Sequence, residues 1–446
     1  MPEMVAVTDE KQPYLASFDR LERQRPRPSW IDPIRRSAIE RFDELGFPTT
    51  RQEEWRRTSL AALTRIPFEP PDAGRGAPDA APLPLGAVLD GADPGSRLVF
   101  INGRLARQLS SVRGLPAGAW LGSLAEAAEE HRGLVEPHLA RHAPAAPFVA
   151  LNTAFLDEGA FLFLPKDTIL AEPVHLVFFS VSGARPTVTH PRTLVVAEAA
   201  SQARIVETYA GDGVYFTNAV TEIVLGENAV LDHHKLQDEN RSAFHIATVQ
   251  ARVERSGSFS SHSMSIGGAL VRNDLNAVLE AEGADCSLDG LFLAGSGQHV
   301  DNHTAIDHVR PHGTSRELYK GILGAGGRGV FDGKIVVRKD AQKTDAMQVN
   351  RNLLLSDDAL IDTKPQLEIY NNDVKCKHAA TIGRLDDSSV FYLRSRGIDE
   401  KAARLLLLRA FASEVIGRVK LDRMRSRLEG AVTALLSEAE RVGRAS

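Results

Sequence analysis

The chain has 446 residues, of which 43% are hydrophobic and 25% are charged, and its formal net charge at pH 7 is −5. This length predicts two or three structural units, and the composition is that of an ordinary globular protein. The negative charge gives no electrostatic reason to expect nucleic acid or an anionic membrane as partner, and two cysteines exclude a disulfide framework.

The first residues do not look like a targeting segment. They lack the basic and apolar regions of a secretory signal, and Glu3, Asp9 and Glu10 argue against a transit peptide. No run of about eighteen apolar residues occurs that could cross a membrane. We therefore expect a cytoplasmic protein.

Residues 1–145 are predicted to form an N-terminal helical domain with one insertion. Residues 31–45 have apolar side chains at roughly helical spacing and end at Gly46, which suits a helix C-cap. Three further elements are predicted in this part: a loop or linker over 70–94, a strand–turn–strand over 97–105 with Asn102-Gly103 at the corner, and an interrupted helix over 121–139.

Residues 146–395 are predicted to form a β core, because apolar and polar residues alternate there with period two. Near the end of this stretch Asp340-Ala341, Asp358-Ala359 and Asp373-Val374 each open a new run, at intervals of 18 and 15 residues. Recurring strand patterns favour a right-handed parallel β-helix whose coils stack on one another. A pair of β-sandwiches is the alternative.

Residues 396–446 are predicted to form a C-terminal helical domain, with Asp399 as the N-cap of its first helix. The apolar stripe of this helix is wider than packing against one neighbour needs. Either the helices cover the open end of the β-coils, or part of the stripe meets another protein.

Two motifs resemble nucleotide sites without meeting their requirements. Residues 324–329 match G-x-G-x-x-G, but a strand pattern follows where a dinucleotide fold needs a helix, so a turn between coils is predicted. Lys334 follows Gly333, yet the remaining residues of a Walker A motif are missing.

Histidines gather in the β region, most densely between His299 and His308. They could ligate iron or zinc, or they could form hydrogen-bonded ladders across the coils. We favour the ladder, since no ligand spacing typical of either metal is evident.

Cys376 and His378 lie two residues apart, which places both side chains on one face of a strand. A small buried thiol beside a satisfied histidine is one interpretation, and a reactive or ligating pair is the other. Lys375 and Lys377 would lower the thiol pKa if their side chains approached it. With two cysteines about ninety residues apart, the chain can supply only part of a typical [4Fe-4S] site.

Several segments closely resemble the SufB/SufD family of scaffold proteins of the SUF iron–sulfur cluster assembly system. They are residues 47–60 (FPTTRQEEWRRTSL), 298–308 (QHVDNHTAIDH), 342–383 (from QKTDAMQVN to KHAATIG) and 391–411 (FYLRSRGIDEKAARLLLLRAF). The resemblance implies a β-helix core between helical terminal domains. It also implies a complex of two sister scaffolds, SufB and SufD, with the ATPase SufC.

Within the family the chain follows the SufD pattern, because SufB typically has acidic residues where Cys376 and His378 stand. The resemblance implies that His378, with Cys376 beside it, is a candidate ligand of a transient iron–sulfur cluster shared with SufB. It further implies a reduced flavin in the complex, a homodimer when SufB is absent, and SufC binding by the terminal helices. The expected contact residues for these partners are Arg394, Arg396, Gly397, Leu405, Leu408 and Phe411.

Two other functions remain open at this point. A purely structural ATPase-binding partner would need no ligand in this chain. A β-helix enzyme acting on polysaccharide would explain the fold, but such enzymes are usually secreted, and only 6% of the residues are aromatic.

Overall fold

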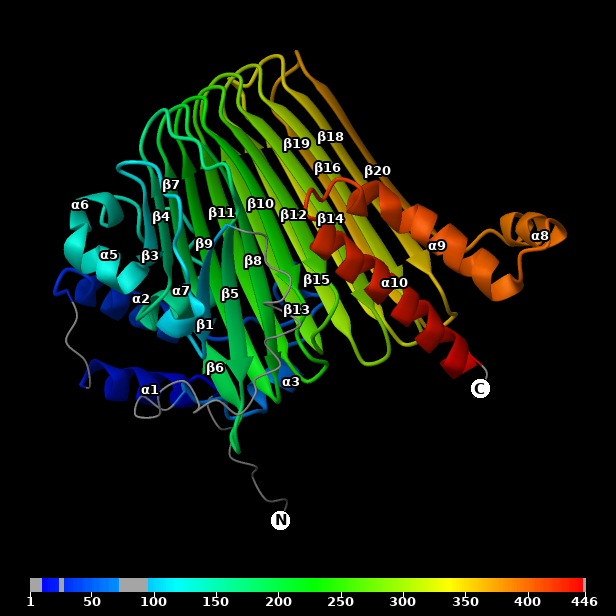
Figure 1. Ribbon diagram of the computed structural model, residues 1–446, viewed down its shortest axis with the longest axis horizontal. Helices are drawn as coiled ribbons and strands as arrows, with labels where there is room; N and C mark the ends of the chain where they lie inside the picture. The colour runs from blue at the N-terminus through cyan, green and yellow to red at the C-terminus, as the bar shows by residue number, and fades with distance from the viewer. Residues whose placement is uncertain (1–9, 24–27, 72–94, 444–446) are drawn as a thin grey trace.

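The structure is a computed structural model and describes residues 10–23, 28–71 and 95–443. Its centre is a parallel β-helix with helices at both ends of the chain, which confirms the predicted mainly β fold class (Figure 1). Most of the linker predicted over 70–94 lies outside the described residues. None of the described helices is long and apolar enough to cross a membrane.

Two sheets form the wall of the β-helix, and from β7 onward successive strands alternate between them. In spatial order the first sheet comprises β2 (Arg104–Leu105), β1 (Ser96–Ile101), β5 (Val174–Val181), β8 (Gln202–Asp212), β10 (Val230–Gln237), β12 (Ser258–Ser265), β14 (Asp285–Ala294), β16 (Thr314–Leu323), β18 (Asp345–Leu354) and β20 (Lys375–Gly383). The second sheet comprises β19 (Leu360–Ile369), β17 (Arg328–Val337), β15 (His299–His308), β13 (Leu270–Leu279), β11 (Phe244–Val253), β9 (Tyr215–Leu225), β7 (Arg192–Ala197), β4 (Ala160–Leu164) and β3 (Trp120–Ser123), with β6 (Thr187–Thr189) beside β9.

One coil is therefore about 30 residues long, as the in-register pairs Ser315–Ala346 and Ala346–Cys376 show. The sequence intervals of 18 and 15 residues correspond to half-coils, because each new strand joins the opposite sheet. Alternate side chains of both sheets point inward and form one continuous apolar core, which includes Phe259, Cys286 and Ile335. The Gly-rich motif at 324–327 is a turn between β16 and β17, as predicted.

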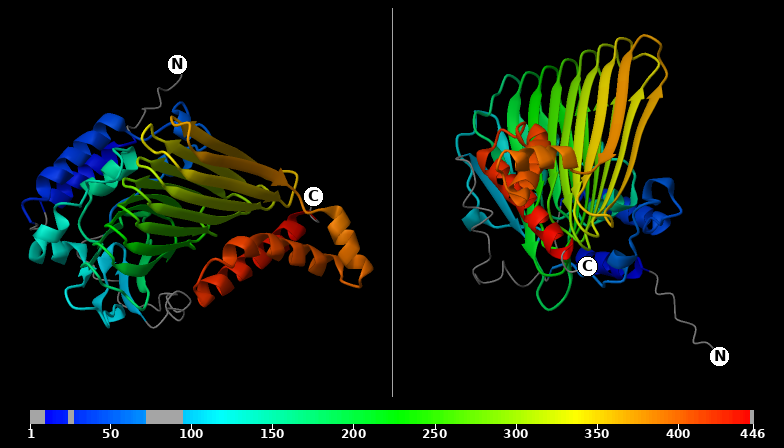
Figure 2. Two further views of the ribbon diagram at one scale, coloured as in Figure 1. Left: turned by 90° about the horizontal axis from the view of Figure 1, so that it is seen from above. Right: turned by 90° about the vertical axis from the view of Figure 1, so that its right-hand side faces the viewer.

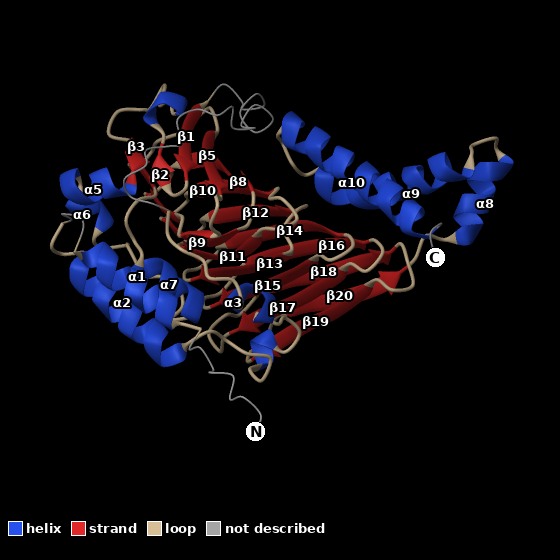
Figure 3. Ribbon diagram, turned by 90° about the horizontal axis from the view of Figure 1, so that it is seen from below, coloured by secondary structure: helices blue, strands red, loops and turns tan. Residues whose placement is uncertain are grey.

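The N-terminal helices pack at one end and along one side of the β-helix (Figure 3). They are α1 (Gln12–Glu22), α2 (Asp32–Leu45), α3 (Ala61–Thr64), α5 (Leu124–Glu130), α6 (Arg132–Val135) and α7 (Pro147–Ala154), with short 3-10 turns at Glu53–Trp55 and Arg107–Leu109. The predicted helix before Gly46 and the strand–turn–strand around Asn102-Gly103 are both confirmed. Within residues 1–145, β1 and β3 pair with strands of the core, so this region also contributes to the sheets.

The C-terminal helices are α8 (Asp387–Ser395), α9 (Glu400–Ile416) and α10 (Asp422–Gly443). Asp399 caps α9 as predicted, since its carboxylate accepts a hydrogen bond from the Ala402 amide. Helices α9 and α10 lie across the outer face of the first sheet, whereas α8 projects away from the β-helix (Figure 2). They do not close the last coil, so the alternative in which they cover the open end is wrong.

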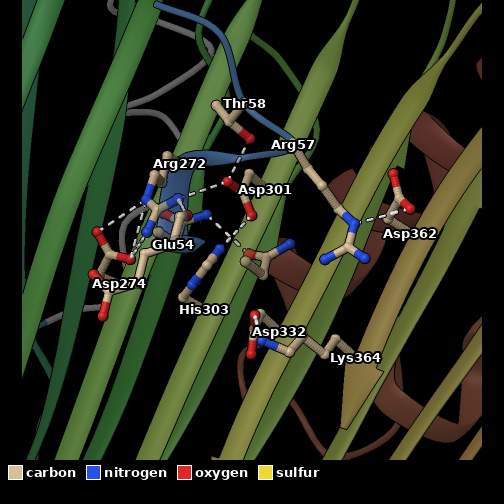
Figure 4. A network of polar contacts seen from close by, with 12 residues as sticks. Glu54, Arg57, Thr58, Arg272, Asp274, Asp301, His303, Asp332, Asp362 and Lys364 are labelled. Atoms are coloured by element: carbon tan, nitrogen blue, oxygen red, sulfur yellow. Dashed lines mark hydrogen bonds and ion pairs between the residues drawn. The ribbon is translucent and has the colours of Figure 1, made fainter. Parts of the chain in front are cut away.

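Two of the histidines of β15, His299 and His303, belong to a polar network with the N-terminal segment (Figure 4). His308 instead contacts the Ser315 hydroxyl in the core, at 2.9 Å. Asp301 accepts hydrogen bonds from Thr58 at 2.6 Å and from Arg272 on the next strand at 2.9 Å, and His303 Nε2 lies 3.0 Å from its other oxygen. The Arg272 guanidinium also lies over the Trp55 ring, 3.9 Å from its centroid. Of these contacts only the Arg272–Asp301 bond crosses between coils, so the predicted ladder is found here for the aspartate and not for the histidines. The network anchors residues 54–58 to the second sheet.

Candidate functional site at the last coil

The last coil of the β-helix brings Cys376 and His378 to the open end of its interior. Both lie on β20 with their side chains on its inward face, as period-two alternation predicts. Cys376 is half-buried and continues an inward row that runs through Ala346 and Ser315 to Cys286. His378 is exposed, because no further coil covers it.

A second inward row leads from His378 into the core. His378 pairs in register with Gln348, and Gln348 pairs with Glu317. Gln348 Nε2 donates a hydrogen bond of 2.7 Å to one Glu317 oxygen, and the Thr304 hydroxyl donates one of 2.6 Å to the other. Burial raises the pKa of Glu317 to about 7, although both hydrogen bonds oppose the shift. The row therefore places a carboxyl group two coils away from the exposed imidazole of His378. This carboxyl group can hold a proton near neutral pH.

The thiol of Cys376 is not activated by its neighbours in this chain. Burial raises its pKa, and the charge of Asp345 adds to the shift. Lys375 and Lys377 are exposed and point to the opposite face of the strand, so they do not produce the lowering that their sequence positions suggested. Cys376 and His378 offer one sulfur and one nitrogen, which is an incomplete ligand set for a cluster.

Within the part of the chain that the structure describes, both sheets end at this coil in strands that have a neighbour on one side only, β20 in the first sheet and β19 in the second. Such edges are templates for pairing with another chain. Apolar side chains are exposed along them, including Leu360 at 54%, Tyr370 at 61% and Ile382 at 50%. Pro365, on β19, is a residue type that sheets admit mainly at edges.

The C-terminal helices carry the residues expected to contact partners, and the structure divides them into two groups. Arg394, Arg396 and Gly397 are exposed at the end of α8. Leu408 is fully buried against the first sheet, so it stabilises the docking of α9 and does not face a partner.

Leu405 and Phe411 are half-buried beside this core. Lys320 Nζ lies 4.5 Å from the centroid of the Phe411 ring, which holds that ring to the sheet. Both side chains therefore present only part of their surface to another molecule.

The exposed apolar surface of this region lies on α8 and on one side of α9. Phe391 and Tyr392 on α8 are 72% and 58% exposed, and Leu406 on α9 is 50% exposed. Leu406 lines an open cavity of about 300 Å³ between α9 and α10, together with Arg409, Ala410, Ala412, Ser413, Ile416, Glu429 and Val432. Leu406 belongs to the wide apolar stripe predicted for this helix, whereas Phe391 and Tyr392 were not expected as contact residues. Helical periodicity does not say which side of α9 meets the sheet.

Sequence reasoning also missed Glu317 and Gln348. The signal that could have found them is the coil length, since residues about 30 apart occupy equivalent positions on neighbouring strands of one sheet. Counting back from His378 in coil lengths leads to both.

The sequence matches two family models, which together span the β-helix and the region before it. Residues 179–411 match the family model described as SUF system FeS cluster assembly, SufBD core domain, and residues 94–176 match the SufBD protein N-terminal region. An iron-sulfur cluster assembly SufBD family protein from Synechocystis is 35% identical over 410 residues, covering 90% of each chain.

The iron-sulfur cluster assembly protein SufD of Escherichia coli is 32% identical, covering 86% of this chain and 88% of its own length. The protein of the same name from Bacillus subtilis is 26% identical over 94% of this chain. With the family models spanning both the β-helix and the region before it, the chain belongs to the SufBD family of iron–sulfur cluster assembly proteins and is a homologue of SufD.

Proposed function

We propose that this chain is a non-catalytic scaffold subunit that pairs with a SufB-type sister through its last coil and carries SufC-type ATPases on its C-terminal helices. The observation that carries the proposal is the open end itself. Two unpaired strand edges, exposed apolar side chains and an incomplete ligand pair are found at one place. A second chain that completes the sheets would also complete the ligand set.

In this proposal the nascent iron–sulfur cluster forms at the interface of the two scaffolds. His378 offers an exposed imidazole, which is an exchangeable iron ligand suited to a cluster that must leave. Cys376 has a secondary part, since burial raises its thiol pKa and reduces the thiolate available at neutral pH. The cluster is cargo of the complex, and a reduced flavin remains a prediction for which we assign no residue of this chain.

ATP binding by the attached ATPases would move the C-terminal helices and rearrange the scaffold interface. Helix α8 projects from the body and exposes Phe391 and Tyr392, which gives a partner an apolar grip on the helices (Figure 1). Helices α9 and α10 share an apolar core with the first sheet, through which displacement of α8 would reach the β-helix. ATP hydrolysis belongs to the partner.

The test is an affinity purification of the tagged chain co-expressed with a SufB-type scaffold and a SufC-type ATPase, followed by anaerobic cluster reconstitution. We expect all three chains to be recovered together, and we expect His378→Ala to retain both partners while losing most of the cluster absorbance. His312→Ala, on an exposed turn of the same β-helix, is the matched control and should behave as the wild type.

Normal cluster formation by the His378→Ala complex would remove the ligand role and leave a purely structural partner. Recovery of the chain without either partner would overturn the scaffold proposal as a whole.

A further inference from the structure

Two histidines and an aspartate converge on the outer face of the first sheet, away from the last coil. Asp232 and His234 lie two residues apart on β10, so both point to the same face. His262 on β12 pairs in register with His234. The two imidazole rings stack with their centroids 4.6 Å apart and their planes 13° from parallel.

The potential ligand atoms of the three side chains surround a common point. Asp232 Oδ1 lies 3.1 Å from His234 Nε2 and 3.3 Å from His262 Nε2, and the three ligand atoms all lie within 4.8 Å of one another. Two imidazole nitrogens and one carboxylate oxygen on one side of an ion form the facial triad that suits Fe(II) and related divalent transition metals.

Several polar atoms of this group have no well-formed hydrogen bond. They are both ring nitrogens of His234, Nδ1 of His262 and Oδ1 of Asp232, and the carboxylate oxygen is held only by its close contacts with the two imidazoles. His234 is fully buried and the His262 side chain is 8% exposed. Buried polar atoms are nearly always satisfied, so a buried imidazole nitrogen and a carboxylate oxygen that face each other without a well-formed hydrogen bond suit a shared cation.

A supporting layer of side chains contacts His262 and Asp232. Asp289 Oδ2 lies 3.4 Å from Nδ1 of His262, where a carboxylate behind a metal-binding imidazole is expected. Arg418 donates a 2.6 Å hydrogen bond to the other Asp289 oxygen. Arg204 Nε donates to Asp232 Oδ2 at 3.2 Å, which leaves Oδ1 free for a metal.

These supporting side chains connect Asp232 and His262 to the C-terminal helices. Arg418 and Lys420 belong to the short connector between α9 and α10, which Figure 1 shows beside the first sheet. Lys420 Nζ lies 3.7 Å from Asp232 Oδ2, and its side chain is 67% exposed and able to withdraw. A divalent cation bound by Asp232 and the two histidines would replace the positive charge that Lys420 now supplies.

We propose that Asp232, His234 and His262 form a binding site for one divalent transition metal ion, with Fe(II) as the physiological class. The site is separate from Cys376 and His378 and does not depend on a partner chain. Binding there weakens the contact between Lys420 and Asp232, so occupancy of the site is coupled to the position of the α9–α10 connector.

The test uses the full chain and Co²⁺ as a spectroscopic probe under anaerobic conditions. We expect one Co²⁺ per chain with visible d–d bands and no thiolate-to-cobalt charge-transfer band, since the site contains no sulfur. Asp232→Asn and His262→Gln should each weaken binding at least about 100-fold, and Asp289→Asn about 10-fold. Lys420→Gln should strengthen binding several-fold.

His175→Gln is the matched control and should bind Co²⁺ as the wild type does. His175 lies on β5 in the same outward row as His234, with Val206 between them, and contacts the Thr208 hydroxyl at 2.8 Å. The melting temperature of the wild type should rise with Co²⁺, and that of the folded His262→Gln variant should not.

Equal Co²⁺ binding by wild type and His262→Gln would overturn the proposal, as would a signal that disappears in Cys376→Ser. In either case the three side chains would serve only to hold the α9–α10 connector against the first sheet. Loss of the scaffold complex in the separate purification would not affect this outcome, because the Co²⁺ titration uses the chain alone.

Discussion

The buried carboxyl group of Glu317 fixes the position of Gln348, the residue next to the exposed His378 in the inward row. Glu317 is held by Thr304 and in turn holds Gln348, the residue in register with His378. Gly333 makes room for this arrangement, because a Cβ at that position would lie 2.4 Å from Gln348 Nε2. The polar row is therefore built into the core by side chains from both sheets.

Replacing Glu317 by Gln should stabilise the protein, increasingly so as the pH rises. The folded pKa of about 7 lies above the ordinary value of 4.5, so the folded state binds more protons than the unfolded state between these values. Glu317 therefore destabilises the fold as pH rises through this window, by about 3 kcal/mol once ionisation is complete. The uncharged amide avoids this penalty, and the free Oε1 of Gln348 can accept its hydrogen bond.

Melting temperatures of both proteins at pH 5 and pH 8 test this expectation. The difference between Glu317→Gln and the wild type should be small at pH 5 and clearly positive at pH 8. Glu282→Gln, on an exposed turn, serves as the control for nonspecific charge effects. A difference that stays constant between the two pH values would contradict the buried, protonated carboxyl.

At the scale of the elements, one turn conformation repeats along the β-helix. A residue with positive φ recurs once per coil, and in each case its backbone N–H donates to a carbonyl in the turn of the next coil. The stack is Asp167, Ala200, Asn228, Ser256, Gly283, His312 and Lys343. Non-glycine residues with positive φ are uncommon, so six of the seven accept a strained conformation that these hydrogen bonds hold in place.

Gly283→Ala should destabilise the protein by about 1 kcal/mol, and the cause should be the backbone alone. Gly283 has a φ of 71°, and an added Cβ would meet only Ser256 Oγ, at an ordinary 3.4 Å. Gly283→Asn should cost less, since Asn tolerates this conformation better. Denaturation midpoints of the two variants provide the measurement, and an Asn variant that is less stable than the Ala variant would refute the backbone explanation.

The sequence allowed the fold class to be predicted because period-two alternation is a local signal. It also placed Cys376 and His378 on one face, since their relation depends only on spacing within one strand. The coil length was missed because the turn residues differ from coil to coil, with Ser256, Gly283 and His312 in equivalent places.

Contacts between distant segments were not predictable in the same way. Glu317 meets Gln348 across one whole coil, and Asp301 meets Thr58 across 243 residues. The burial of Leu408 depends on how α9 docks on the first sheet, which helical periodicity alone does not define.

At the scale of the whole molecule, the two ends of the β-helix differ. The first coils are covered by α5, α6 and the antiparallel strand β3, whose side chains join the core there. Among the described residues, no strand pairs with the outer edges of β19 and β20. This asymmetry gives the molecule one end that is stable in isolation and one that favours association.

An acidic residue at this open end should prevent association without unfolding the chain. Ile382 on β20 is 50% exposed, so Ile382→Asp should leave the melting temperature nearly unchanged, whereas a second β-helix cannot bury a carboxylate there without a large desolvation cost. We expect the variant to lose the proposed SufB-type scaffold in co-purification. We also expect the isolated wild type to form dimers through this end and the variant to be monomeric at the same concentration.

Ile169→Asp is the matched control, because Ile169 is 60% exposed on an early coil, far along the β-helix from β20. It should retain the partner and the dimer of the isolated chain. Retention of the scaffold by both variants would place the interface elsewhere on the molecule. Loss of the scaffold by both variants would mean that added negative charge weakens assembly through long-range repulsion, and its suppression by salt would identify that cause.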